Sequence, residues 1–244
     1  MDRPPPELDL DRVAFFLDFD GTLVDIAPTP DAVVVPPALP ELLAALREAS
    51  GGALAVVSGR SLAALDRLLG LPLDAAGLHG AEWRLRGERF VAPPGPALAE
   101  ARAHLAEIAR RHGLLLEDKG AGAALHFRDR PELEGLIDRE LQARLAGLPG
   151  LRLVRGKCVR EVLPAGVDKG AAVARFLAQP PFAGRLPVYA GDDLTDEDAF
   201  AVLAERGGLT IKVGEGASRA ARRLASPAEL RAWLAGLASG SLVS

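Results

Sequence analysis

The chain has 244 residues, of which 49% are hydrophobic and 25% charged, and its formal net charge is −4. This composition is typical of a globular protein and excludes a largely disordered chain. The weak negative charge supplies no basic field for nucleic acid, and no uncharged apolar stretch reaches membrane-spanning length, so neither partner is expected. Cys158 is the single cysteine, which excludes an intramolecular disulfide and favours a reducing cytoplasm. No sequence feature indicates an oligomeric state.

The first 83 residues alternate between predicted strands and helices. The apolar run 13–17 predicts a buried parallel strand, because it is short and is followed by Gly21. Apolar residues at helical spacing predict helices over 36–49 and 62–69. A second buried strand is predicted between them, over 53–57.

The middle segment, residues 84–164, has a different pattern of short strands that alternate polar and apolar residues around two helices. The predicted elements are helices over 97–112 and 131–145 and strands over 114–119, 123–128 and 151–163. This mixture is typical of an inserted α+β domain.

The α/β alternation resumes at about residue 165. The predicted elements are helices over 168–177 and 195–203, strands over 186–190 and 209–213, and helices near Ser218 and Pro227. Thr195 and Asp198 are predicted to cap the second of these helices. We therefore predict an α/β fold, with a doubly wound parallel sheet formed by 1–83 and 165–244 and an inserted domain over 84–164.

Acidic residues follow two of the predicted strands. Asp18 and Asp20 come directly after the first strand, and Asp192 and Asp193 follow the strand 186–190. Carboxylates that meet at one sheet edge repel one another unless a cation neutralises them or some take up protons. The pattern predicts a Mg²⁺ site with a spare carboxylate nucleophile.

Each acidic residue has a predicted role. Asp18 would attack phosphorus, and Asp20 would protonate the leaving alcohol and then take a proton from water. One of Asp192 and Asp193 would ligate Mg²⁺, and the other would orient a ligand or a lysine. The plain alternatives are that Asp18 and Asp20 shape a turn, and that Asp196 acts as a helix N-terminal carboxylate instead of a supporting acid.

Two further polar residues stand where a phosphate site needs them. Ser58, directly after the strand 53–57, can donate to a phosphoryl oxygen, and Lys169 can place a compact positive charge on the phosphate. Lysine is rare in this chain: of 29 basic residues, the lysines are Lys119, Lys157, Lys169 and Lys212. We infer that a retained lysine marks a place where an ammonium is needed, the alternative being a solvated surface residue.

These residues together resemble the motifs of the haloacid dehalogenase superfamily of phosphotransferases. The four motifs appear as Asp18-Phe19-Asp20-Gly21-Thr22, Ser58, Lys169 and Gly191-Asp192-Asp193, and the resemblance covers roughly residues 11–83 and 165–238. Within that superfamily the sequence is similar to the trehalose-6-phosphate phosphatase family in the stretches 17–23, 57–60, 77–82, 156–164, 167–170 and 191–200.

The resemblance implies a set of site residues. Catalysis is assigned to Asp18, Asp20, Ser58 and Lys169, and the metal, Mg²⁺, to Asp18, Asp20 and Asp192. Substrate contacts in the core are assigned to Thr22, Arg60, His79 and Asp193. His79, beside a glycine, faces the crevice or packs at the hinge.

The resemblance also implies that the insertion is a mobile cap that binds a sugar phosphate. The matching cap residues are Glu117, Lys119, Lys157 and Glu161, with His126 and Arg128 as weaker candidates. Sugar hydroxyls both donate and accept hydrogen bonds, which suits neighbouring carboxylate and ammonium groups. The alternative is an exposed sheet face with paired Glu and Lys. The chain departs from the family at Leu163, where members usually carry Arg or Lys before a proline.

The activity implied by the resemblance is hydrolysis of trehalose 6-phosphate through an aspartyl-phosphate on Asp18, in trehalose biosynthesis. The alternatives are a phosphatase of another sugar phosphate, such as sucrose phosphate or a glycosyl phosphoglycerate, a phosphomutase, and a catalytically silent binder. Tyr189 and Cys158 are interpreted as packing residues, and His104 and His112 as fillers.

Overall fold

The computed structural model describes residues 5–6, 8–93, 95–156 and 158–240. The chain divides into a core unit, Met1–Arg89 with Asp168–Ser244, and a cap unit, Phe90–Val167. The borders predicted from the sequence lie after residues 83 and 164. In the described part of the chain, no helix combines the length and the apolar composition that crossing a bilayer requires.

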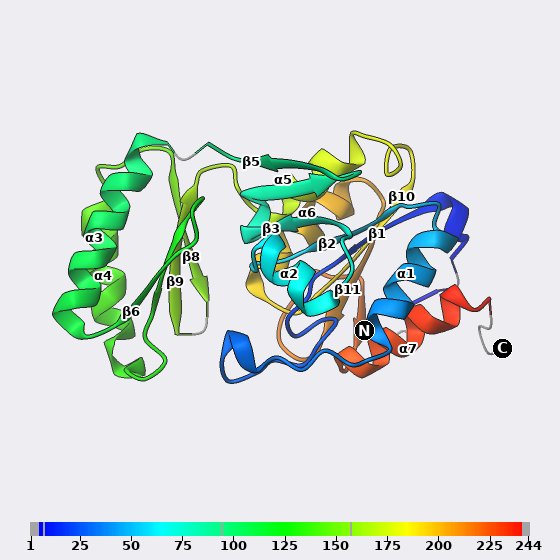
Figure 1. Ribbon diagram of the computed structural model, residues 1–244, viewed down its shortest axis with the longest axis horizontal. Helices are drawn as coiled ribbons and strands as arrows, with labels where there is room; N and C mark the ends of the chain where they lie inside the picture. Colours follow the sequence, from blue (N-terminus) through cyan, green and yellow to red (C-terminus); the bar gives the residue numbers. More distant parts are fainter. Residues whose placement is uncertain (1–4, 7, 94, 157, 241–244) are drawn as a thin grey trace. The chain divides into compact units, whose positions relative to one another are not determined.

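The core unit is built on a sheet with the strand order β12-β11-β10-β1-β2-β3-β4-β5 (Figure 1). The strands are β1 Val13–Leu17, β2 Leu54–Val57, β3 Asp74–Gly77, β4 Glu82–Leu85, β5 Glu88–Val91, β10 Leu186–Gly191, β11 Leu209–Val213 and β12 Arg222–Leu224. In this order, each pair of adjacent strands from β12 through to β3 is parallel, and β4 is antiparallel to β3. The predicted parallel α/β sheet is confirmed, and the β4–β5 end extends it beyond the predicted core boundary.

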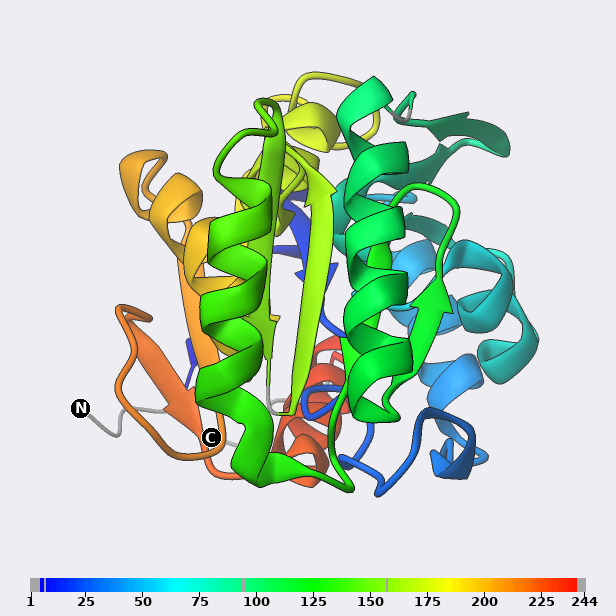
Figure 2. The same cartoon turned by 90° about the vertical axis from the view of Figure 1, so that its left-hand side faces the viewer.

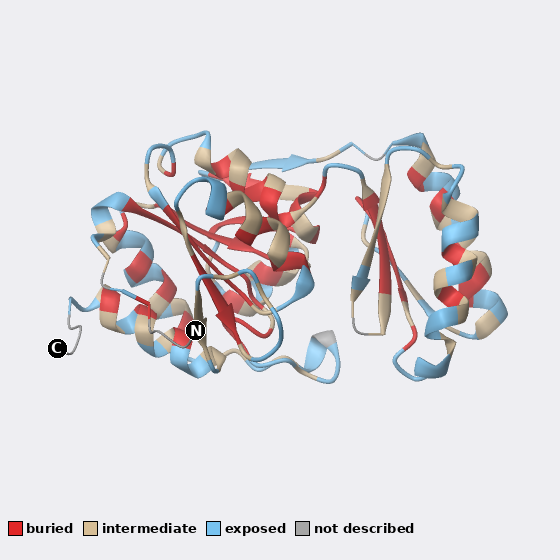
Figure 3. Cartoon of the chain, turned by 180° about the vertical axis from the view of Figure 1, so that it is seen from behind, coloured by how far each residue is buried: buried red, intermediate tan, exposed pale blue. Residues whose placement is uncertain are grey.

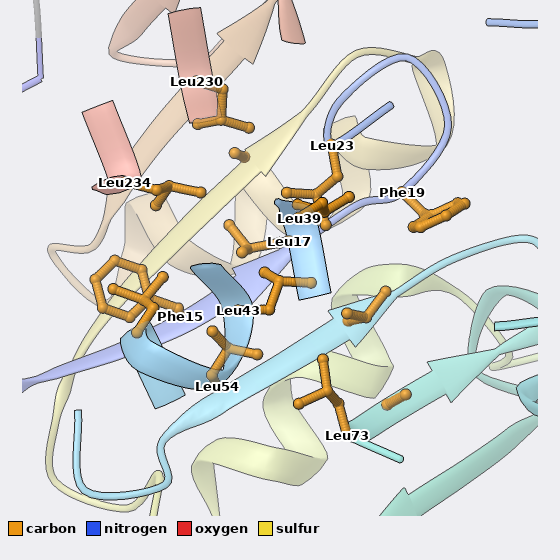
Figure 4. Packing of buried hydrophobic residues seen from close by; sticks show 14 of the residues in the cluster. Phe15, Leu17, Phe19, Leu23, Leu39, Leu43, Leu54, Leu73, Leu230 and Leu234 are labelled. Atoms are coloured by element: carbon orange, nitrogen blue, oxygen red, sulfur yellow. The ribbon is translucent and has the colours of Figure 1, made fainter. Parts of the chain in front are cut away.

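Helices cover both faces of this sheet, because successive residues of its central strands point to opposite sides. Phe15 and Leu17 of β1 pack in one apolar cluster, with α1 Leu39–Ala49, α2 Leu62–Leu69 and α7 Pro227–Ala238. Ala14 and Phe16 pack in the other, with α5 Lys169–Leu177 and α6 Glu197–Glu205. Figure 3 shows the central strands buried along their length, and Figure 4 shows the first cluster around Phe15 and Leu43.

The cap unit is an antiparallel sheet with the order β6-β7-β9-β8, and two helices cover one of its faces (Figure 2). Its elements are α3 Pro96–His112, β6 Leu115–Asp118, β7 Ala123–His126, α4 Glu134–Leu145, β8 Leu151–Gly156 and β9 Val159–Pro164. Leu125 and Val162 pack against the helices. Arg160, also on this face, binds Asp138 of α4 (Nε–Oδ1 2.6 Å) and holds that helix to the sheet.

Three local predictions are wrong. The single strand predicted over 151–163 is the hairpin β8–β9, whose connection contains Cys158 at φ 57°. No helix forms near Ser218 in the described chain; its hydroxyl donates to Glu197 (2.6 Å), and the following residues form the edge strand β12.

The third error concerns the start of the helix predicted over 195–203. The predicted capping pair, Thr195 with Asp198, is replaced by a capping box between Asp193 and Asp196. This box caps the short 3-10 helix Leu194–Asp196, which precedes α6.

Candidate active site

The candidate active site lies in the core unit at the carboxyl ends of β1 and β10. Leu17 pairs with Ala190 in the parallel register, and the backbone N–H of Asp18 donates to the Ala190 carbonyl (3.0 Å). Asp18 and Asp192 therefore leave adjacent strands at the same sheet edge. This edge is where open α/β sheets bind their ligands.

Gly21 allows the two acidic loops to approach each other. Its φ is 76°, in the left-handed region, and a Cβ at this position would lie 2.1 Å from Oδ2 of Asp192. Only a residue without a side chain fits both constraints. The glycine after the Asp-x-Asp pair thus makes room for the carboxylate of Asp192.

Three carboxylates form a compact cluster at this edge. Asp18, Asp192 and Asp196 each contribute one oxygen, and these oxygens all lie within 4.8 Å of one another. Burial raises the pKa of Asp18 well above its usual value, although the charge of Lys169 opposes the shift. Burial and the charge of Asp196 raise the pKa of Asp192 to about 6. At neutral pH the cluster therefore favours binding a cation or retaining a proton.

Lys169, the first residue of α5, lies between two of these carboxylates. Its Nζ is 2.8 Å from Oδ1 of Asp18 and 2.8 Å from Oδ1 of Asp196, and the residue is only 3% exposed. Asp168 holds the helix start, accepting from the backbone N–H of Ala171 (2.6 Å). Burial opposes the ammonium charge, but the two carboxylates outweigh it and raise the pKa of Lys169, so the ammonium stays charged.

Asp196 has a hydrogen bond on every lone pair that its carboxylate offers. Oδ1 accepts from Lys169 and from the hydroxyl of Tyr189 (2.7 Å), and Oδ2 accepts from the backbone N–H groups of Asp192 (3.0 Å) and Asp193 (2.9 Å). A carboxylate with four donors has no oxygen free for a cation. Asp196 therefore holds the loop at the start of the 3-10 helix, and it also binds Lys169 as a supporting acid. The sequence left these two roles as alternatives, and Asp196 combines them.

Oxygen atoms of Asp18 and Asp192 remain as the natural ligands of a hard divalent cation. Thr22, predicted to contact substrate, is buried between them: its Oγ1 is 3.2 Å from Oδ2 of Asp18 and 3.4 Å from Oδ1 of Asp192. Asp20, predicted as a third metal ligand, has its carboxylate outside this cluster. The donor set thus fits a metal such as Mg²⁺ through two carboxylates, as this cation prefers.

Asp20 is bound by an arginine. The Arg60 Nε lies 2.7 Å from Oδ2 of Asp20, and Nη2 lies 2.8 Å from Oδ1, a two-point contact. Ser58 is 1% exposed and its Oγ accepts from the backbone N–H of Arg60 (3.1 Å). The turn 58–60 therefore links Ser58, the predicted phosphate donor, to Arg60, which orients Asp20, the predicted acid.

His79 and Asp193 are positioned by the local backbone. The backbone N–H of His79 donates to the carbonyl of Ser58 (2.9 Å), and a Cβ on Gly59 would come within 2.8 Å of its Nε2. The imidazole thus lies against the serine turn. Asp193 is exposed, and its Oδ1 accepts from the backbone N–H of Leu194 (2.6 Å), so it acts as a helix cap.

Four of the predicted sugar-binding residues lie on the face of the cap sheet opposite α3 and α4: Glu117, Lys119, Glu161 and His126. Glu117, Ala124 and Glu161 form one row across β6, β7 and β9. Lys119 Nζ lies 3.3 Å from Glu161 and 3.9 Å from Glu117. The Nε2 of His126 lies 2.9 Å from Glu117, and this hydrogen bond is the main reason that the pKa of Glu117 is lowered.

Two further cap residues were predicted. Lys157 lies outside the described residues. Arg128, the weaker candidate, is exposed in the turn after β7.

Two residues of the site were missed from the sequence. Tyr189, interpreted as a packing residue, is fully buried as predicted but also donates to Asp196. Lys212 of β11 is buried, and its Nζ donates to the carbonyl of Asp192 (2.7 Å) and to that of Val213 (2.7 Å). The scarcity of lysine was the available signal for Lys212; no comparable signal marked Tyr189.

The architecture is the haloacid dehalogenase-like fold. A solved haloacid dehalogenase-like hydrolase from Bacteroides thetaiotaomicron shares the fold with a TM-score of 0.68, at 17% identity, over 91% of this chain and 98% of its own. The C-terminal domain of Candida albicans trehalose-6-phosphate phosphatase shares it with a TM-score of 0.81, at 24% identity, over 95% and 93%.

The family model of the trehalose-phosphatases matches residues 16–228. Trehalose-6-phosphate phosphatase of Escherichia coli (strain K12) is 43% identical over 94% of this chain and 87% of its own length. A probable trehalose-phosphate phosphatase of Sinorhizobium fredii is 46% identical over 94% and 89%. The chain therefore belongs to the trehalose-phosphatase family and is a phosphoric monoester hydrolase.

Proposed function

We propose that the protein is a Mg²⁺-dependent phosphatase that hydrolyses trehalose 6-phosphate to trehalose and phosphate, with Asp18 as nucleophile. The position of the Asp18 carboxylate carries this proposal: it is buried at the end of β1, 2.8 Å from the Lys169 ammonium and beside Asp192. The names and the coverage of the two relatives support the substrate. The single cysteine supports a reducing cytoplasm as the place of action.

Bound at Asp18 and Asp192, Mg²⁺ would supply the positive charge that offsets repulsion between the nucleophile and the phosphoryl oxygens. Lys169 is placed to bind a phosphoryl oxygen, because its ammonium already contacts the attacking carboxylate. Ser58 would donate its hydroxyl hydrogen to a second phosphoryl oxygen. Together Lys169 and Ser58 would orient the phosphoryl group for attack by Asp18.

The reaction proceeds in two half-reactions. An Asp18 oxygen attacks phosphorus, the bond from phosphorus to the sugar oxygen breaks, and Asp20 gives its proton to that oxygen. Asp20 then takes a proton from water as the water oxygen attacks the aspartyl-phosphate. The phosphorus–Asp18 bond breaks, free phosphate leaves, and Asp18 and the protonated Asp20 are restored.

The polar row of the cap sheet supports a sugar as the alcohol part of the substrate. Hydrogen-bond donors and acceptors lie close together in this row, with contacts of 2.9 to 3.9 Å between the side chains of Glu117, Lys119, Glu161 and His126. The hydroxyls of one sugar ring could therefore reach several of them at once. Sugar hydroxyls pair with both kinds of group. A sugar hydroxyl would exchange with the existing contacts between these side chains.

A panel of sugar phosphates tests the substrate. We expect trehalose 6-phosphate to give a kcat/KM at least about tenfold above sucrose 6-phosphate, a glucosyl phosphoglycerate and glucose 6-phosphate. Phosphate release should stop on chelation of divalent metal and return with Mg²⁺. A preference for another ester would overturn the substrate, and isomerised sugar phosphate without free phosphate would indicate a phosphomutase.

Asp18→Asn tests the nucleophile. The change keeps the shape of the side chain and should lower kcat by about 10³-fold or more. Acid quenching of the wild type during turnover should place phosphate on the peptide that contains Asp18. The matched control is Asp11→Asn, an exposed change of the same charge at the opposite end of β1, which should keep the wild-type rate.

Glu161→Gln tests the cap residues. We expect kcat/KM for trehalose 6-phosphate to fall about tenfold, because one charged acceptor for sugar hydroxyls is lost. Hydrolysis of p-nitrophenyl phosphate, which has no sugar, should be unchanged. Glu100→Gln is the control, since Glu100 is exposed on α3, at the other face of the cap sheet. Equal losses with both substrates would contradict a role in sugar binding.

A further inference from the structure

Tyr189 and Lys169 bind the same oxygen atom of Asp196. Tyr189 lies on β10 and is fully buried, and its hydroxyl donates to Oδ1 of Asp196 over 2.7 Å. The ammonium of Lys169 donates to this oxygen over 2.8 Å. The other oxygen of Asp196 is occupied by the backbone N–H groups of residues 192 and 193.

The Lys169 ammonium is shared between Asp196 and Asp18, each at 2.8 Å. Any group that withdraws negative charge from Oδ1 of Asp196 weakens its attraction for Lys169. A hydroxyl donor on the same oxygen acts in this way, because hydrogen bonds to one acceptor compete for its charge. The ammonium is then left more available to the Asp18 side of the site.

Packing alone does not require a hydroxyl at position 189. The aromatic ring packs edge-on against Phe200, with ring centroids 5.7 Å apart and an interplanar angle of 88°. A phenylalanine would make the same ring contact without burying a polar atom. Since a buried hydroxyl needs a partner to offset its desolvation, the Tyr189–Asp196 hydrogen bond is the feature that a tyrosine adds here.

We propose that Tyr189 is a positioning residue that balances the Lys169 ammonium between Asp196 and the reacting groups. This role rests on the proposed function in one respect, since it assumes that Lys169 binds the transferring phosphoryl group. Without the hydroxyl, Oδ1 of Asp196 attracts Lys169 more strongly. In a protein without this hydroxyl, the Lys169 ammonium therefore stabilises the phosphoryl oxygens in the transition state less than it does in the wild type.

Tyr189→Phe tests this role through steady-state kinetics with trehalose 6-phosphate and p-nitrophenyl phosphate. We expect kcat to fall about tenfold with both esters, because one hydrogen bond to a charged group is lost, and KM to stay within about twofold of the wild type. The control is Phe200→Leu, which disturbs the same ring packing but leaves the hydroxyl; it should lower the unfolding temperature and keep kcat. A wild-type kcat in Tyr189→Phe, or an equal loss in Phe200→Leu, would overturn the proposal.

A spectroscopic measurement tests the shared oxygen without Tyr189→Phe. The chain has a single tyrosine, so growth with 3-fluorotyrosine labels position 189 alone. The ¹⁹F resonance should shift in Lys169→Met, because Oδ1 of Asp196 loses its other donor, and should not move in Lys119→Met in the cap unit. An unmoved resonance in Lys169→Met would overturn the proposal.

These outcomes separate the positioning role from the proposed substrate. A wild type that hydrolyses p-nitrophenyl phosphate but not trehalose 6-phosphate would overturn only the substrate. The ¹⁹F shift and the kcat for the aryl ester would still decide the role of Tyr189.

Discussion

The Arg60 guanidinium binds the Asp20 carboxylate at two points, Nε to Oδ2 at 2.7 Å and Nη2 to Oδ1 at 2.8 Å. Such a contact fixes the plane of the carboxylate and presents N–H donors to both of its oxygens. The contact uses one lone pair on each Asp20 oxygen and leaves the second lone pair on each outside it. Arg60 therefore fixes the direction in which Asp20 can exchange a proton with a leaving group, and a phosphate ester is an alternative partner for the guanidinium.

We predict that Arg60→Met lowers kcat/KM by about 10- to 100-fold, because Asp20 loses its orientation and the phosphate loses a donor. Arg60→Lys should recover only part of the rate, since an ammonium cannot bind two oxygens in one plane. Steady-state kinetics on folded variants measures both effects. Arg89→Met, which removes an exposed partner of Asp66, is the control and should keep the wild-type rate. A wild-type rate in Arg60→Met would contradict the assigned role.

The stability of the metal-free protein should depend on pH through Asp192. Its pKa rises from 3.8 to about 6 on folding, mainly through burial and then through the charge of Asp196. A raised pKa means that the folded state binds the proton more tightly, so this group stabilises the fold below about pH 4 and the stabilisation is lost as the pH rises through about 6. Above that pH, Mg²⁺ should restore stability, because it binds the ionised carboxylate.

The measurement is urea unfolding of the metal-free protein between pH 4 and pH 8. Asp192→Asn should be more stable than the wild type at pH 8 by roughly 1–3 kcal/mol and nearly equal to it at pH 4. Asp11→Asn, an exposed change, should follow the wild-type curve. Parallel curves for the wild type and Asp192→Asn would show that Asp192 does not titrate in this range.

The sheet and the acidic core of the site were predictable from local pattern. The run Val13–Leu17 is short and apolar throughout, as expected of a strand with helices on both faces, and the strand has the predicted bounds. Because parallel strands end at a common edge, the positions of Asp18 and Asp192 after their strands were enough to predict that they meet.

Contacts made by tertiary packing were not predictable in this way. The segment around Ser218 has helix-forming residues, but Glu197 of α6 binds Ser218 and Arg219 and holds the segment outside a helix. The bond from Tyr189 to Asp196 depends on how the loop after β10 folds back over the strand. In the sequence, Gly191 is the residue that indicates this close approach of the loop. A Cβ at position 191 would lie 2.3 Å from Cγ of Asp196, so the loop can fold back only over a glycine.

Gly21→Ala should damage the site by displacing Asp192. An alanine there must adopt a φ of 76°, and its Cβ would lie 2.1 Å from Oδ2 of Asp192, far inside contact distance. The φ alone should cost about 1 kcal/mol of stability. The collision should in addition weaken Mg²⁺ binding, measured by calorimetry, by at least about tenfold, because a metal site tolerates only small shifts of its ligands.

Gly70→Ala separates the two effects. Gly70 ends α2 with a similar φ of 62°, and a Cβ there would meet no atom within 4 Å. This variant should lose about 1 kcal/mol of stability through its backbone and keep the wild-type affinity for Mg²⁺. Equal Mg²⁺ affinities in Gly21→Ala and Gly70→Ala would mean that the close approach of Asp192 to Gly21 has no part in metal binding, because backbone strain is common to both variants and the collision is not.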